Sequence, residues 1–177
     1  MNQVSTLAVL VGGQEHPGNH DGIDIEPTAI ALDIDGNIIV ADSNNNRVHK
    51  ITTDGQVSTV AGSGSTSFAD GQSSAAHFNC PCSIAISNEG LIVVADTYNN
   101  RIRTITPEGM VTTLAGSGVA GFADGPGIEA EFNHPHGICI DHNGNVIVAD
   151  SRNHRVRIVT KAGQVSTLAG SGNADFG

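Results

Sequence analysis

VADSNNNRVHKI (40–51), VADTYNNRIRTI (94–105) and VADSRNHRVRIV (148–159) are three versions of one sequence, each starting 54 residues after the previous one. Repetition at a fixed period of this size indicates that a chain is built from stacked copies of one supersecondary unit. One repeat therefore predicts the architecture of the whole chain.

Within each repeat, apolar and polar residues alternate with a period of two, and Gly, Asn and Asp interrupt the alternation. This pattern is typical of short strands joined by tight turns, and helical spacing is absent. In the second repeat it predicts strands at 83–87, 91–96, 101–106 and 110–116, followed by a loop over 116–135. Four antiparallel strands and a long connection form one blade of an all-β fold, the β-propeller.

The repeats divide a single domain, residues 1–177, into blades, a lone strand and a connector. We predict a lone outer strand at 3–11, blades at 28–61, 82–115 and 136–169, and a truncated connector at 170–177. Three blades are too few to close a ring and would leave two apolar blade faces uncovered, which monomers rarely do. We therefore expect part of a longer propeller, or a half-ring that closes as a homodimer.

Composition excludes several classes of protein. The formal net charge is −10, which disfavours nucleic acid as a partner, and no apolar run reaches the ~20 residues of a membrane span. The first residues, MNQVSTLAVLVGGQ, lack the basic region of a signal peptide, and three Cys form no disulfide framework. From these features we predict a cytoplasmic protein without a membrane partner.

The repeat resembles the NHL repeat. In the third copy, FNHPHGICIDHNGNVIVADSRNHRVRIV, the shared features are Pro before an apolar strand, a Gly-Asn turn, VAD, and Asn or His before Arg. The resemblance covers nearly the whole chain three times and implies a six-bladed ring, of which three repeats make half. It also implies an interaction module, since NHL domains are mostly such modules, although some bind RNA and the related amidating lyases are metal-dependent enzymes.

Residues present in every copy are expected to serve the blade itself. Each VAD aspartate is followed five residues later by an arginine, a spacing that lets the carboxylate cap turn amides and meet the guanidinium. The structural repeat positions are Asp42 with Arg47, Asp96 with Arg101, and Asp150 with Arg155. A catalytic or ligand-binding role for the carboxylates is the alternative interpretation.

Residues that differ between copies are free to serve a partner. Charged and aromatic side chains in the turn and third strand of repeats two and three are the partner-binding candidates: Tyr98, Arg103, Arg152, His154 and Arg157. A protein or peptide would bind these residues on a loop-bearing face. The same basic side chains would serve RNA recognition, with Tyr98 as a stacking platform.

One further repeat position follows Pro at the start of the strand nearest the propeller axis. It holds Thr28, Cys82 and His136, which we place at the mouth of the central channel. The resemblance to amidating lyases implies a zinc-binding His in the sequence PH, which only His136 matches. Because a zinc site needs about three protein ligands, Cys82 and His136 are weak metal candidates, and we predict neither a metal nor another cofactor.

Three smaller features of the sequence concern the connectors and the cysteines. The first connector, 12–27, lacks the FADG of the later ones, and its His16, His20 and Asp21 are assigned to a polar loop rather than a metal site. FADG at Phe68 and Phe122 is expected to anchor its connector by burying the ring. Cys80 and Cys82 lie two apart and therefore do not form a Cys-x-x-Cys redox motif.

These observations predict a non-enzymatic propeller scaffold that binds a protein or peptide and completes a six-bladed ring. A metal-dependent lyase or lactonase is the first alternative, and an RNA-binding domain is the second.

Overall fold

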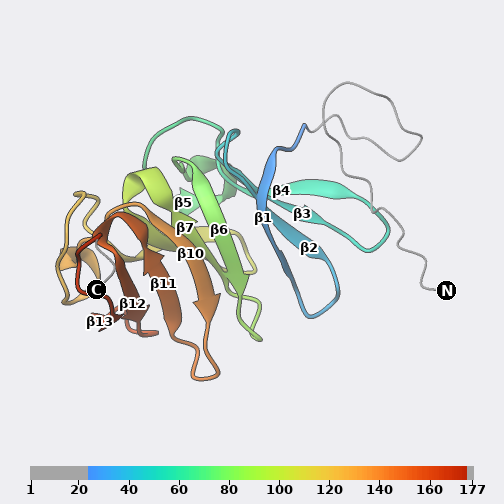
Figure 1. Ribbon diagram of the computed structural model, residues 1–177. Coiled ribbons are helices and arrows are strands. Elements are labelled where there is room, and N and C mark those ends of the chain that lie inside the picture. The colour runs from blue at the N-terminus through green and yellow to red at the C-terminus, as the bar shows by residue number, and fades with distance from the viewer. Residues whose placement is uncertain (1–23, 175–177) are drawn as a thin grey trace.

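The computed structural model describes residues 24–174, which form three β-sheets arranged side by side (Figure 1). Blade 1 comprises β1 (Pro27–Leu32), β2 (Ile38–Asp42), β3 (Arg47–Ile51) and β4 (Val57–Ala61). Blade 2 comprises β6 (Pro81–Ile86), β7 (Ile92–Asp96), β8 (Arg101–Ile105) and β9 (Met110–Ala115). Blade 3 comprises β10 (Pro135–Ile140), β11 (Val146–Asp150), β12 (Arg155–Val159) and β13 (Val165–Ala169).

Every blade is an antiparallel sheet whose strands are neighbours in sequence order, so the predicted all-β, four-stranded repeat is confirmed. The repeats also keep one register, because Ala41 pairs with Val48, Ala95 with Ile102, and the third blade repeats this pairing. In blade 2, the short strand β5 (Gly71–Gln72) of the preceding connector joins the outer edge at β9. The connector thus covers an edge that would otherwise be open to pairing with another chain.

The turns keep the same conformation in each repeat because the residues that require it recur. Gly36, Gly90 and Gly144 each have φ of +81° in the turn between the first two strands. Asn46, Asn100 and His154 take left-handed φ values between +50° and +52° just before the third strand. Asn adopts this conformation readily, and Gly adopts it without steric cost.

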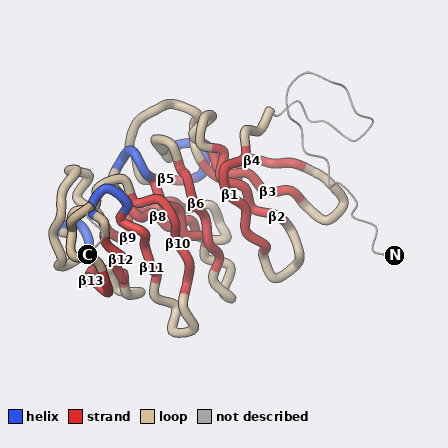
Figure 2. Tube along the Cα trace, in the orientation of Figure 1, coloured by secondary structure: helices blue, strands red, loops and turns tan. Residues whose placement is uncertain are grey.

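Helical structure in residues 24–174 is limited to four 3₁₀ turns (Figure 2): η1 (Ser73–Ala75), η2 (Thr97–Asn99), η3 (Gly127–Glu129) and η4 (Ser151–Asn153). Two of these turns lie in connectors and two follow a second strand, where the sequence predicts only turns. None of the helices in this part of the chain has the length and apolar character needed to cross a membrane.

The apolar core lies between the blades. The first strands β1, β6 and β10 lie next to one another, and two buried clusters fill the seams between successive blades. Each seam contains one fully buried phenylalanine from the connector, Phe78 in the first and Phe132 in the second. The middle strand β7 is buried along its whole length because it has a blade on both sides.

Blades 1 and 3 each have one apolar face without a neighbour among residues 24–174. On blade 1, Ile30 is 65% exposed, whereas Ile84 at the same position of blade 2 is 6% exposed. On blade 3, Val156 is 38% exposed, whereas its counterpart Ile102 is fully buried. The predicted outer strand 3–11, the loop residues His16, His20 and Asp21, and the end of the predicted connector 170–177 lie outside the described residues.

Candidate functional site

A buried polar network occupies the end of the second strand in every blade. Asp96 accepts hydrogen bonds from the Asn79 backbone amide at 2.8 Å and from Asn99 Nδ2 at 2.9 Å, and it pairs with Arg103 at 2.7 Å. Asp150 has the equivalent partners, with its ion pair to Arg157 also at 2.7 Å. Burial raises the pKa of Asp96, and the three donors oppose that rise.

The connector supplies the second half of this network. The Arg103 guanidinium is fully buried and also binds Asp70 Oδ1 at 2.7 Å and the Ala69 carbonyl at 2.7 Å. Arg157 binds Asp124 and Ala123 in the same way. These aspartates belong to the FADG segments, which therefore tie each connector to the blade that follows it. Among the described residues, every buried side-chain nitrogen and oxygen has a hydrogen-bond partner.

The structure contradicts two predictions about these residues. Arg103 and Arg157 were expected to contact a partner, but both are enclosed inside their blade and do not reach the surface. The expected pairing of each Asp with the Arg five residues later is also wrong, because the side chain that pairs with each Asp lies seven residues later. In blade 1 that position is His49, whose Nε2 lies 3.2 Å from Asp42.

The arginines at the five-residue spacing bind backbone carbonyls instead. Arg101 donates to the Ser117 carbonyl at 2.7 Å, and Arg47 and Arg155 each reach the equivalent serine carbonyl at 3.0 Å. Gly118 has a left-handed φ of +94°, and a Cβ there would also crowd the Arg101 guanidinium, which explains the second glycine of the GSG segment. All six structural repeat positions thus lie within the scaffold.

The phenylalanine of FADG is not buried as predicted but lies beneath an arginine. Phe68 is 42% exposed and is not buried as predicted, but the Arg101 guanidinium lies over its ring at 3.7 Å. Phe122 and Arg155 repeat this contact at 3.8 Å. The buried rings are those of Phe78 and Phe132, ten residues further on, so the connector is held by both an apolar and a cation–π contact.

We call the face on which β1, β6 and β10 begin the upper face, because it lies uppermost in Figure 1. The exposed Tyr98 packs edge-to-face against His134, with ring centroids 5.3 Å apart. Partial burial, followed by the charge of Arg152, lowers the pKa of His134. Tyr98, His134 and Arg152 therefore form one patch across the seam between blades 2 and 3, and His154 is exposed beside Arg152 in the chain.

Both turns of this patch are fixed by the backbone. The Tyr98 amide donates to the Asn79 carbonyl, and the Arg152 amide donates to the Asn133 carbonyl, each at 3.1 Å. In blade 1 the corresponding Asn44 hydrogen-bonds Glu26, so the upper face there is acidic rather than aromatic and basic. His134 is not among the predicted site residues, although its repeat-specific position next to a Pro was a usable signal.

The three channel-mouth candidates have different surroundings. Thr28 Oγ1 lies 2.5 Å from Ser43 Oγ, which donates to the Pro81 carbonyl at 2.7 Å and lies 3.9 Å from Cys82 Sγ. His136 is exposed on β10. Cys82 contacts Cys80, with 3.3 Å between the two sulfurs, rather than hydrogen-bonding His136. Within residues 24–174, no three His, Cys, Asp or Glu side chains converge as a metal site would require.

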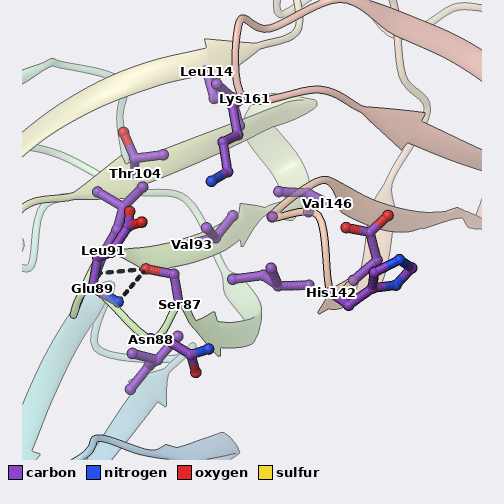
Figure 3. A pocket seen from close by; sticks show the side chains of 14 residues that line it. Ser87, Asn88, Glu89, Leu91, Val93, Thr104, Leu114, His142, Val146 and Lys161 are labelled. Atoms are coloured by element: carbon purple, nitrogen blue, oxygen red, sulfur yellow. Dashed lines mark hydrogen bonds between the residues drawn. The ribbon is translucent and has the colours of Figure 1, made fainter.

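The opposite, lower face has a hollow between blades 2 and 3 (Figure 3). Its volume is about 430 Å³, its floor is apolar, and its rim carries Glu89, His142 and Lys161. Ser87 Oγ accepts hydrogen bonds from the amides of Glu89 and Leu91, which fixes one wall. The rim charges have both signs and the polar groups do not converge, so this hollow is a weaker candidate than the upper face.

Comparisons with protein families agree with the repeat structure. The NHL repeat matches residues 132–159, and the Teneurin NHL domain matches residues 19–106. The chain is 39% identical over 80 residues to the chloroplastic protein SUPPRESSOR OF QUENCHING 1 of Arabidopsis thaliana, a match covering 45% of this chain and 8% of that protein. It is 36% identical over 112 residues to NHL repeat-containing protein 2 of Bos taurus, covering 56% and 15% of the respective chains.

Solved structures show the same fold in longer chains. An auxiliary nutrient binding protein from Bacteroides thetaiotaomicron superposes with a TM-score of 0.69 at 25% identity, over 79% of this chain and 37% of that one. Virginiamycin B lyase from Staphylococcus aureus gives a TM-score of 0.58 at 18% identity, over 85% and 43% of the respective chains. At that identity the likeness to the lyase concerns the fold alone.

Proposed function

Because the chain belongs to the NHL-repeat β-propeller family, we propose that it is a non-enzymatic scaffold that binds a protein or peptide through its upper face. Tyr98, His134 and Arg152 are the proposed contact residues, together with the exposed His154 and His136, each two residues from one of them in the chain. The relatives are much longer than the segment that they share with this chain, so the proposal concerns the propeller part alone.

The proposal rests on the separation between repeated positions, which are buried, and repeat-specific residues such as Tyr98, which are exposed. Positions that recur in the repeats are buried in the networks of Asp96, Asp150 and their arginines, whereas the repeat-specific Tyr98 is 56% exposed on a fixed turn. An exposed Tyr beside an imidazole and a guanidinium offers apolar area and hydrogen bonds at low entropic cost. Interfaces are enriched in Tyr and Arg for these reasons.

The test is selection of peptides from a displayed random library on the full chain. We expect Tyr98→Ser and Arg152→Ser to weaken binding of the selected peptides at least about tenfold, since losing an interface anchor costs about 1.4 kcal/mol or more. Glu89→Ser, on the lower face, is the matched control and should leave binding unchanged.

Two results would overturn this proposal. Peptides that bind Tyr98→Ser as well as the parent chain would exclude the upper face as their site. Binding of single-stranded RNA that depends on Arg152 and weakens steeply with salt would instead support the nucleic-acid alternative.

We further propose that the uncovered faces of blades 1 and 3 pack on additional NHL blades and so complete a six-bladed ring, and that a second copy of this chain can supply them. Ile30 and Leu32 present the face that blade 2 uses toward its preceding neighbour, and Val156 and Leu168 present the face used toward a following one. The two faces are therefore complementary, as the existing seams are.

Light scattering over a range of concentrations tests this closure. A mass twice that of the chain, reduced to the monomer by Val156→Glu, would support it, with Val119→Glu at an exposed position of the second connector as the matched control. A well-folded monomer at all concentrations would contradict closure by a second copy.

A further inference from the structure

We propose that Cys80 and Cys82 form a dithiol site on the upper face that a low-molecular-weight disulfide, such as glutathione disulfide, oxidises reversibly to an intrachain disulfide. The two sulfurs are 3.3 Å apart and both residues are partly exposed. A small side-chain rotation would bring the sulfurs to the roughly 2 Å of a disulfide bond.

The backbone around the pair is held in place from two blades. The Cys80 amide donates to Asn46 Oδ1 of blade 1 at 2.8 Å, and the Pro81 carbonyl accepts from Ser43 at 2.7 Å. On the blade 2 side, the Cys80 carbonyl accepts from the Thr97 amide. Because these bonds fix the chain, the thiols are already positioned and lose little conformational freedom on bonding.

Local geometry explains why two cysteines with one residue between them meet. Cys80 has a left-handed φ of +56°, and Pro81 fixes the backbone that follows. The equivalent pairs are Glu26 with Thr28 and His134 with His136, so the dithiol is specific to blade 2. The spacing of Cys80 and Cys82 excludes a Cys-x-x-Cys motif, but the closer spacing, with this backbone conformation, brings the two sulfurs together.

The chemistry assigns different roles to the two thiols. Burial, together with the adjacent Cys82, raises the pKa of the Cys80 thiol to about 11, so Cys80 stays protonated at neutral pH. Cys82 therefore attacks the disulfide first, forming a mixed disulfide and releasing one glutathione. Cys80 then loses its proton and attacks Sγ of Cys82, releasing the second glutathione.

Over the two steps the electrons balance. The two protein thiols together lose two electrons and two protons, and one glutathione disulfide becomes two glutathione molecules. A disulfide across so short a loop is strained and therefore easily reduced, as expected of a reversible site rather than a structural one.

The test equilibrates the full chain in glutathione buffers of increasing oxidation and then alkylates the remaining thiols for mass spectrometry. We expect the chain to lose the mass of two hydrogens and two alkyl labels in one step, while the exposed Cys139 keeps its label. Cys80→Ser should instead stop at the mixed disulfide, with glutathione attached to Cys82, and Cys139→Ser should behave as the parent chain.

Three results would overturn the proposal. One is a parent chain that stops at the mixed disulfide, and another is a disulfide that links Cys139 of two chains. The third is a chain that keeps all three labels in the most oxidising buffer. The parent chain alone decides each case, so the test does not depend on how well the variants fold.

Discussion

Blade 1 and blade 2 solve the same structural problem with different side chains. Both bury an aspartate at the end of the second strand, but Asp96 faces Arg103, whereas Asp42 faces His49. Arg103 has a second carboxylate available from the connector, Asp70, and its planar guanidinium binds both. His49 instead bonds Thr59 on the neighbouring strand at 3.2 Å.

The difference follows the connectors. FADG precedes blades 2 and 3, which have the arginine, and is missing from the connector before blade 1, which has the histidine. A fully buried guanidinium with five donors needs more acceptors than one carboxylate provides. The loss of FADG and the replacement of Arg by His therefore compensate each other. The FADG connector thus stabilises the blade that follows it.

The largest expected effect is that of Arg103→Met. Removing the guanidinium leaves Asp96 buried without its cation, so we expect the free energy of unfolding to fall by about 3–5 kcal/mol in a urea titration. Arg152→Met removes the same charge from an exposed position and should cost less than about 0.5 kcal/mol. Equal losses in the two variants would contradict the structural role of Arg103.

His49→Leu tests the blade 1 version of the network and should cost less, about 1–3 kcal/mol. Asp42 would still accept hydrogen bonds from Asn45 and from the Glu26 amide, so its carboxylate would not be left without donors. His142→Leu, at an exposed lower-face position, is the control. A loss as large as that of Arg103→Met would mean that blade 1 depends on His49 as strongly as blade 2 depends on Arg103.

A smaller effect on stability is expected for Phe68, the phenylalanine of the first FADG segment. Phe68→Leu keeps apolar contact but removes the aromatic face beneath Arg101 and Arg103, and we expect it to cost about 0.5–1 kcal/mol. Phe122→Leu should cost a similar amount because the Phe122 ring has the same two partners. Val119→Ala in the exposed part of the second connector is the control, and a larger loss there would show that the ring has no special role.

The fold could be predicted because its determinants are local. Alternating residues and Gly or Asn turns specify each strand within a few positions, and the repeat confirms them independently. The partners of Arg103 could not be predicted from such local patterns. Asp70 lies 33 residues away in the connector, which reaches blade 2 at its outer edge, β9. The sequence did contain evidence of this pairing. FADG and the arginine occur together in blades 2 and 3, and both are missing from blade 1.

The candidate site was predicted less completely for the same reason. Tyr98 and Arg152 were recognised as repeat-specific, but their neighbour His134 comes from a different repeat, and only the stacking of blades brings it to them. The proximity of Cys80 and Cys82 depends on a backbone conformation, the left-handed φ at Cys80, that no pattern of residue types specified.

The smallest expected effect separates the lower turns of blades 1 and 2. Asp33 and Ser87 hold the same turn position. Burial alone would raise the pKa of Asp33, but hydrogen bonds from Asn37 and contact with Lys50 lower it from 3.8 to about 2. A depressed pKa means that Asp33 stabilises the fold above its unfolded pKa and loses this contribution as the pH falls toward 2.

Ser87 accepts the turn amides without titrating. We therefore expect Asp33→Ser to lose less stability than the parent chain between about pH 4 and pH 2, and Ser87→Asp to lose more. Urea titrations at both pH values measure these differences. Identical pH dependence in all three chains would mean that the turn amides do not favour the charged carboxylate, and the two turns would then be equivalent in energy as well as in shape.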